Sequence, residues 1–120
     1  MRFEDLEVWK RAARLSAELY QELINLKDYS FKDQITRAGL SISSNIAEGF
    51  ERTSQRECLT FLSYSKGSCG ELRSQLYVGV ETGYIDGETG KAWIKGATEI
   101  SSMLSSLIKT KRGFIKKDST

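Results

Sequence analysis

The chain has 120 residues and a formal net charge of +2, with 28% charged side chains, 39% hydrophobic side chains, no Pro and no His. This composition describes one compact domain and leaves no room for a second. The absence of His excludes Ser-His-Asp and Cys-His nucleophilic sites, and two Cys are too few for the common Cys/His zinc sites. The charge is too small to indicate nucleic-acid binding by itself, although it allows a local basic patch.

The two cysteines and the apolar runs indicate where the protein is found. Cys58 and Cys69 are eleven positions apart, which on one helix separates them by roughly 16 Å and prevents a disulfide. The N-terminus lacks the apolar segment of a signal peptide, and no apolar run approaches the ~18 residues of a membrane span. We therefore expect a cytoplasmic protein with reduced thiols and no membrane contact.

The first half of the chain predicts two helices. Apolar residues recur at steps of three and four over residues 4–26, which is typical of an amphipathic helix. A second helix is expected over residues 30–50, because Ser30 followed by Asp33 resembles a capping box. Gly49 and the residue after it supply a plausible end to this helix.

The second half predicts two further helices. Ser54 and Glu57 form a capping box at the start of a helix over residues 54–82. After a glycine-rich turn, a fourth apolar repeat over residues 88–111 predicts a helix that ends at Gly113. No alternating pattern typical of a strand persists anywhere.

Four helices with short connections predict an all-α fold, an antiparallel up-down-up-down four-helix bundle with long helices. We expect the bundle to occupy residues 1–113 and a short, polar, frayed tail to occupy residues 114–120. The third helix alone would be roughly 43 Å long, so an elongated bundle is expected rather than a sphere.

The second predicted helix carries a line of small polar and charged residues. Two interpretations are open. The line is either a solvated helix face or a close, hydrogen-bonded helix contact, the latter because Ser and Asn are mediocre helix formers on an ordinary exposed face. We select as the candidate contact patch Arg37, Ser41, Ser44, Asn45, Glu48, Gly49 and Arg52.

Three motifs carry a family resemblance. The opening FxxLxVW over residues 3–9, the string SISSNIAEG over 41–49 followed by Arg52, and GSCGEL over 67–72 stand in order along the chain. With these motifs the sequence resembles the four-helix-bundle proteins encoded in intervening sequences of bacterial 23S rRNA genes. The resemblance implies an antiparallel four-helix bundle that assembles into a ring-like homopentamer, with no established enzymatic activity.

That family is similar in fold to the accessory protein of diversity-generating retroelements, a basic pentamer that binds a reverse transcriptase and nucleic acid. The likeness implies a role in binding RNA or a ribonucleoprotein. The alternative is a protein-interaction scaffold for a nucleic-acid enzyme such as a reverse transcriptase, without direct RNA contact. Both expectations rest on analogy at the level of fold.

Basic residues on the first, third and fourth predicted helices are candidates for phosphate contact. Cations near the end of the fourth helix also favour its dipole without any ligand, so that alternative stays open. The candidates are Lys10, Arg11, Arg14, Arg56, Lys109, Lys111 and Arg112. No aromatic motif of the RRM type is present, and sequence-specific base reading is not expected.

Aromatic residues at helical spacing are usually core residues, and we expect this for most of the aromatic side chains here. On the third and fourth helices, however, Phe61, Tyr64, Tyr77 and Ile94 exceed what one buried face uses. We expect them to remain exposed in a monomer and to favour self-association, with Phe50 and Tyr77 in the interface.

Motifs of enzymes are incomplete. The segment GETGK over residues 87–91 has Ile85 where a P-loop requires its first glycine, and Ala92 where it requires Ser or Thr. Ser63 and Lys66 match S-x-x-K without the companion motifs of that class. We expect no catalytic residue, cofactor, metal ion or small-molecule substrate.

Overall fold

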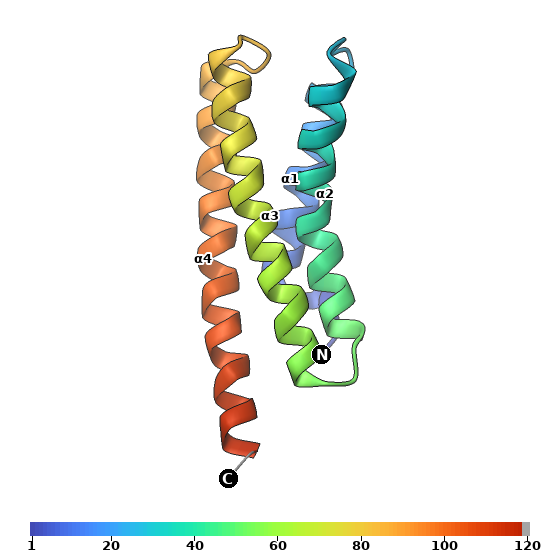
Figure 1. The fold of residues 1–120 in the computed structure, drawn as a ribbon, viewed down its shortest axis with the longest axis vertical. Helices are drawn as coiled ribbons and strands as arrows, with labels where there is room; N and C mark the ends of the chain where they lie inside the picture. The colour runs from blue at the N-terminus through green and yellow to red at the C-terminus, as the bar shows by residue number, and fades with distance from the viewer. Residues whose placement is uncertain (119–120) are drawn as a thin grey trace.

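The computed structural model describes residues 1–118 and consists of four helices preceded by one short 3-10 turn (Figure 1). The turn is η1 (Phe3–Asp5), and the helices are α1 (Glu7–Glu22), α2 (Tyr29–Glu51), α3 (Gln55–Glu81) and α4 (Gly87–Asp118). Consecutive helices pack against each other and α1 packs against α4, whereas the backbones of the diagonal pairs do not approach each other closely within the described chain. The fold is therefore all-α, and the helices run up-down-up-down around one core.

The core follows the long axis of the bundle and is made mainly of Leu and Ile. Its largest fully buried apolar side chains are Leu19, Ile35, Ile42, Ile46, Leu62, Leu72, Leu76, Ile100 and Leu104. Where one helix contributes several of them, they are four, seven or ten residues apart, a spacing that places them on one face of the helix. The molecule measures 53 × 22 × 20 Å, which confirms the elongated shape. At its C-terminal end α4 runs past the α2–α3 connection (Figure 1).

The bounds of α3 agree with the sequence prediction. Ser54 precedes the helix in an extended conformation, and its hydroxyl accepts a hydrogen bond from the Glu57 backbone N–H at 3.1 Å. Thr82 closes the helix, and Gly83 follows with φ +80°, a left-handed conformation that favours glycine. Both signals are local, so the sequence alone is sufficient to place this helix.

The predicted ends of α1 and α2 need correction. α1 begins at Glu7 rather than at residue 4, because Leu6 is extended (ψ 126°) and packs against the core. It ends at Glu22, four residues before the predicted end. α2 is capped by Asp28 and not by Ser30, since the Asp28 carboxylate accepts from the Phe31 backbone N–H at 3.1 Å.

Two glycines predicted to end helices lie inside them. Gly49 is buried within α2, which continues to Glu51, because Gly49 is the point where α3 comes close: a Cβ there would lie 3.2 Å from the Cys58 carbonyl oxygen. Gly113 is exposed within α4, which continues to Asp118. One glycine costs a helix about 1 kcal/mol, too little to end one this long. Residues 114–118 thus continue α4, and residues 119–120 of the predicted tail lie outside the described residues.

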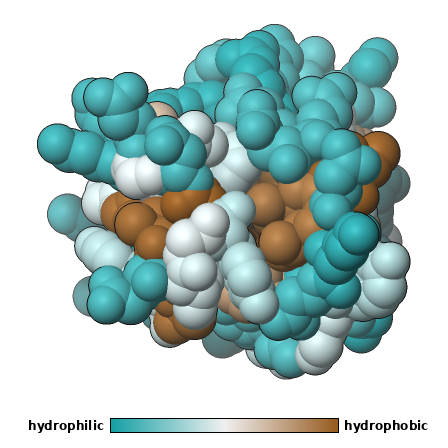
Figure 2. All heavy atoms as spheres, turned by 90° about the horizontal axis from the view of Figure 1, so that it is seen from above, coloured by the Kyte–Doolittle hydropathy of each residue, from teal (hydrophilic) through white to brown (hydrophobic). Residues whose placement is uncertain are grey.

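The end of the bundle that carries the α1–α2 and α3–α4 connections is held by a polar contact between them. The Tyr84 hydroxyl donates to the Asp28 carboxylate at 2.8 Å, and the Tyr84 ring packs on Phe31 with centroids 5.3 Å apart. Viewed onto this end, hydrophilic side chains surround two exposed apolar areas (Figure 2). Ile24, 68% exposed, belongs to the α1–α2 connection.

Candidate nucleic-acid interface

The polar line of α2 is divided between a helix contact and the solvent. Ser41 is half-buried, and its hydroxyl lies 2.7 Å from the Ser68 hydroxyl of α3. The Asn45 amide donates to the Ser41 carbonyl at 2.8 Å. Next to this pair, the fully buried Ser65 hydroxyl donates to the Ile42 carbonyl at 2.7 Å. The interpretation as a close helix contact therefore holds for Ser41, which bonds to α3, and for Gly49, which α3 approaches closely, whereas the Asn45 bond stays within α2.

The remaining members of the line are exposed. Arg37 pairs with Asp33 of its own helix at 3.0 Å, and Ser44 faces the solvent. Glu48 binds Arg52 at 2.6 Å. These residues form the solvated part of the line, and the seven predicted residues do not converge on one site.

Arg52 connects the end of α2 to the start of α3. Its guanidinium contacts Glu48 at 2.6 Å and Glu57 at 3.7 Å, and it lies over the Phe61 ring at 4.8 Å from the centroid. Three partners from two helices fix the short connection between them. This arrangement explains Arg52 without any ligand.

Two of the predicted phosphate-binding residues have partners within the protein. Arg11 pairs with Glu99 of α4 at 3.2 Å and donates to the Met103 sulfur at 3.5 Å. Lys111 lies over the Phe50 ring at 4.8 Å from the centroid. Both side chains hold helices together, so they are poor candidates for phosphate contact.

The other five candidates are exposed, and none of them has an ion pair among the described residues: Lys10, Arg14, Arg56, Lys109 and Arg112. Lys10 and Arg14 lie on α1. Arg56 at the start of α3 and Lys109 and Arg112 near the end of α4 share the opposite end of the bundle from the Tyr84–Asp28 contact, because α3 and α4 are antiparallel.

A groove between α3 and α4 brings one of these residues together with a cation that the sequence analysis did not select. The groove has a volume of about 440 Å³, and its lining consists of Ser63, Lys66, Gly67, Ser105, Ile108 and Arg112. The lining combines two cations with two hydroxyls and contains no carboxylate. Hydroxyls and cations of this kind are the usual partners of phosphate oxygens.

Lys66 could have been found from the charge pattern. No acidic residue occurs between Cys58 and Gly70, or between Ile100 and Lys117, although these two segments face each other in the antiparallel pair. In the sequence, Ser63 and Lys66 stand out only as an incomplete S-x-x-K motif. Both line the groove, on successive turns of the outer face of α3.

The two cysteines are free and buried, which confirms that no disulfide joins them. Burial raises the pKa of the Cys69 thiol to about 11, against the smaller lowering effect of Arg73 and Lys66. Burial also raises the pKa of Cys58, against the effect of Lys111. Both thiols are therefore protonated at neutral pH and are core side chains rather than nucleophiles.

The exposed apolar side chains differ in part from the prediction. Tyr64 and Tyr77 of α3 are 57% and 63% exposed, as expected. Phe61 and Ile94 are instead half-buried, because Phe61 packs beneath Arg52 and Ile94 packs against the core. A second exposed apolar set, which the sequence pattern did not predict, lies on α1, α2 and their connection, namely Tyr20, Ile24, Tyr29 and Leu40.

No group of three or more His, Cys, Asp or Glu side chains in the described part of the chain is placed to hold a metal ion. None of the described helices has an apolar stretch that would span a bilayer.

The comparison with known proteins gives the same family as the sequence motifs. Residues 4–106 match the family of 23S rRNA-intervening sequence proteins. The chain belongs to this family. No curated protein matches the sequence. Among solved structures, a protein of unknown function from the S23 ribosomal protein family of Bacteroides thetaiotaomicron is similar, with 27% sequence identity and a TM-score of 0.80. The match covers 85% of this chain and 98% of that protein.

Proposed function

We propose that this member of the 23S rRNA-intervening sequence protein family is a non-enzymatic, oligomeric protein that binds structured RNA through phosphate contacts. The observation that carries the proposal is the groove between α3 and α4, where Lys66 and Arg112 lie beside two serine hydroxyls with no carboxylate in the lining. Exposed Arg56 and Lys109 on the same two helices extend the basic surface. Cations without competing carboxylates release counterions from RNA when they neutralise phosphates.

Oligomerisation would combine the modest charges of several chains into a field strong enough to attract RNA. A homopentamer would present five copies of the groove, so a net charge of +2 per chain becomes a substantial field. The exposed apolar side chains on α1 and α2 support self-association, since monomeric proteins rarely expose apolar patches of this kind. Light scattering on a sizing column is expected to give about five times 13.5 kDa, and a 13.5 kDa species alone would reject the oligomer.

The experiment for RNA binding is fluorescence anisotropy of a labelled RNA hairpin titrated with the full chain at several salt concentrations. The logarithm of the association constant is expected to fall linearly with the logarithm of salt concentration, by about 0.9 for each phosphate contact on duplex segments. No detectable binding at low salt would eliminate the proposal.

Matched charge variants locate the surface. Arg112→Gln is expected to weaken RNA binding and to reduce the salt slope by about one contact per groove. Lys27→Gln removes the same charge from the exposed α1–α2 connection and is expected to leave both quantities nearly unchanged. Equal effects of the two variants would show that net charge acts, and not the groove.

The second candidate is a protein-interaction scaffold for a nucleic-acid enzyme. The exposed tyrosines of α3, Tyr64 and Tyr77, favour it, because tyrosine is enriched in protein interfaces. It predicts association with a polymerase-like partner that survives nuclease treatment and that Tyr77→Ser weakens.

A further inference from the structure

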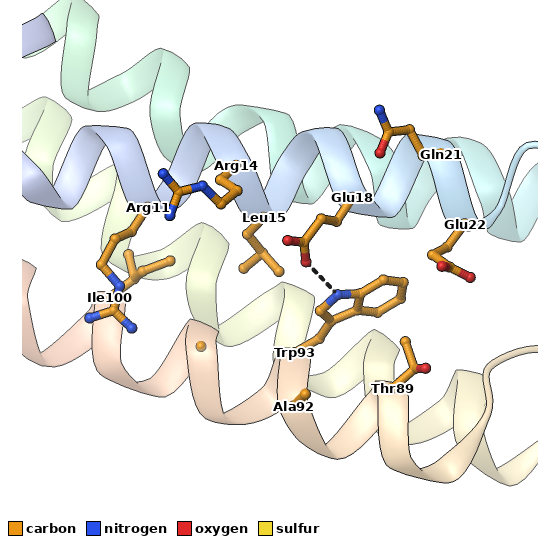
Figure 3. Close-up of a pocket in the computed structure, with 11 residues that line it drawn as sticks. Arg11, Arg14, Leu15, Glu18, Gln21, Glu22, Thr89, Ala92, Trp93 and Ile100 are labelled. Atoms are coloured by element: carbon orange, nitrogen blue, oxygen red, sulfur yellow. Dashed lines mark hydrogen bonds between the residues drawn. The ribbon is translucent and has the colours of Figure 1, made fainter.

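A second groove lies on the other side of α4, between α4 and α1 (Figure 3). Its volume is about 390 Å³, within the range of about 300–1,000 Å³ typical of small-molecule sites. It exists because α4 turns three small residues towards α1, namely Thr89, Ala92 and Gly96. A Cβ built at Gly96 would meet no atom within 4 Å, so the space beside it is open.

The floor of the groove is apolar and aromatic. Trp93, 5% exposed, lies beneath it with Leu15 and Ile100 on the sides. The Trp93 indole N–H donates to one carboxylate oxygen of Glu18 at 3.1 Å, as Figure 3 shows. This bond fixes the carboxylate at the rim, and its second oxygen has no hydrogen-bond partner among the described residues.

Charges of opposite sign stand at the two ends of the groove. Arg14 lies towards one end beside Arg11, Glu22 lies at the other end, and Glu18 lies between them over Trp93 (Figure 3). Arg11 is occupied by Glu99, whereas Arg14 has no ion pair within residues 1–118. The distance from Arg14 to Glu18 is about one helical turn along α1, and to Glu22 about two turns, or roughly 6 and 12 Å. A ligand that matches this groove has an anion at one end, hydrogen-bond donors at the other and a flat body between.

We propose that the α1–α4 groove binds an unpaired guanine nucleotide of the RNA, an inference that rests on the proposed function. The phosphate contacts Arg14, and the base lies against the Trp93 floor with its donor edge towards Glu18. Guanine presents two adjacent donors, N1–H and the 2-amino group. The free oxygen of the Glu18 carboxylate accepts one of these bonds, and the oxygen bound to Trp93 accepts the other through its second lone pair. Adenine and cytosine place a ring acceptor next to their amino group, and uracil flanks its single N–H with two carbonyls, so each repels a carboxylate. Unpaired bases read at this edge are the usual basis of RNA specificity.

The proposal also joins the two grooves into one binding path. The α3–α4 groove and the α1–α4 groove lie on opposite sides of α4 and at different levels along it, and the outward face of α4 carries exposed Lys91, Lys95 and Lys109 together with exposed Glu88. An RNA strand that leaves a structured element on the α3–α4 side crosses this face before its unpaired base reaches Trp93.

The test uses the tryptophan in the floor as its probe. In the full chain with Trp9→Phe, Trp93 is the only tryptophan, and guanosine monophosphate is expected to change its fluorescence with saturation. We expect the dissociation constant to be at least tenfold higher for the adenosine, cytidine and uridine monophosphates. Equilibrium dialysis with the unmodified chain gives the same comparison independently of the fluorescence variant.

Gly96→Leu fills the groove and is expected to raise the dissociation constant for guanosine monophosphate at least tenfold. Gly113→Leu is the matched control, because this exposed glycine of the same helix also has open space around its Cβ position. Glu18→Gln is expected to reduce the preference for guanine over adenine at least tenfold, since the amide NH₂ meets the donors of guanine.

The outcomes separate the two proposals. If RNA binding depends on salt and on Arg112, but the four nucleotides bind equally or Gly96→Leu has no effect, the guanine inference is overturned and the proposed function stands. If the RNA hairpin also fails to bind at low salt, both are overturned.

Discussion

The α2–α3 contact and the α1–α4 contact both contain small residues, with opposite results. Between α2 and α3, small residues of one helix oppose small residues of the other: Gly49 lies against Cys58, and Ser41 against Ser68. The two helices approach closely, and serine side chains join them: the Ser65 hydroxyl donates a buried hydrogen bond to the Ile42 carbonyl, and the Ser41 and Ser68 hydroxyls form a half-buried one. Between α1 and α4, the small residues of α4 oppose long charged residues of α1, whose ends require water.

The difference shows that a small residue does not by itself bring helices together. Where both helices contribute small residues, the gap closes and dispersion contacts replace it. Between α1 and α4 the small residues of α4 face long charged side chains, and there a groove remains, lined by those charged residues. In this bundle α2 and α3 pack most extensively and α1 and α4 least. We therefore assign stability to the first contact and ligand binding to the second.

The sharpest test of this comparison places leucine at one glycine in each contact. Gly49→Leu is expected to lower the free energy of unfolding by about 1–3 kcal/mol, the typical cost of overpacking a tight core. The Cβ alone would lie 3.2 Å from the Cys58 carbonyl and from the Phe61 Cβ, and backbone cannot move aside cheaply. Urea unfolding followed by circular dichroism measures the change.

Gly96→Leu is the companion variant, and it is expected to leave the free energy of unfolding unchanged or slightly higher, because its Cβ meets open space. If both leucine variants destabilise the protein equally, the two contacts are packed alike and the comparison fails.

A smaller loss is expected from the buried hydroxyl of α3. Ser65→Ala removes the 2.7 Å hydrogen bond to the Ile42 carbonyl, and is expected to lower the free energy of unfolding by about 1 kcal/mol. Ser106→Ala, at an exposed position of α4, is the control and should change it by less than about 0.5 kcal/mol. A neutral Ser65→Ala variant would show that close packing alone holds α2 to α3.

What the sequence predicted correctly was decided by local interactions. The start of α3 depends on Ser54 and on a backbone N–H three residues away, so its capping pattern was sufficient. The apolar period was equally sufficient for the four helices and their order. The errors occur where tertiary contacts override a local rule, as at Gly49, which the pattern marks as a helix end and the close approach of α3 keeps inside the helix.

The candidate sites were less predictable for the same reason. Lys66 and Arg112 are 46 positions apart, and only the antiparallel pairing of α3 and α4 brings them to one groove. Arg11 and Lys111 were predicted as phosphate contacts because of their charge. In the fold Arg11 pairs with Glu99 of α4, and Lys111 lies over the Phe50 ring of α2. A charge pattern indicates which residues are available, and the packing of the helices decides which of them remain free.

Adding a single methyl group on the α1–α4 side, by the substitution Gly96→Ala, is expected to stabilise the protein. Gly96→Ala keeps the groove largely open and removes the backbone entropy of a glycine inside a helix, so the free energy of unfolding should rise by about 0.5–1 kcal/mol. Gly39→Ala is the contrasting variant, because its Cβ would come within 2.5 Å of a Leu19 methyl group in the α1–α2 contact. A loss of stability in Gly96→Ala would mean that the groove is not open space.

The smallest expected effect on stability concerns the hydrogen bond between Tyr84 and Asp28 at the end of the bundle. Asp28 precedes α2 and Tyr84 follows α3, so this bond extends the contact between the two helices beyond their ends. The Phe31 backbone N–H and, to a lesser degree, the Tyr84 hydroxyl lower the pKa of Asp28 below its ordinary value of 3.8. Between the folded and the unfolded pKa of Asp28, the unfolded chain therefore binds more protons than the folded one. The contribution of Asp28 to the free energy of unfolding is complete above pH 4 and is lost as the pH falls through the folded pKa.

The same bond acts in the opposite direction on Tyr84. The hydrogen bond to Asp28 and the negative charge of that carboxylate raise the pKa of Tyr84 above 10. Its contribution is therefore complete below pH 10 and is lost as the pH rises through the folded pKa. Tyr84→Phe should flatten the stability profile above pH 10, and it should weaken the dependence below pH 4 only in part, because the Phe31 N–H still binds Asp28. Melting temperatures of the two proteins from pH 3 to 11 measure both limbs, and an unchanged acid limb in Asp28→Asn would contradict the assignment to this carboxylate.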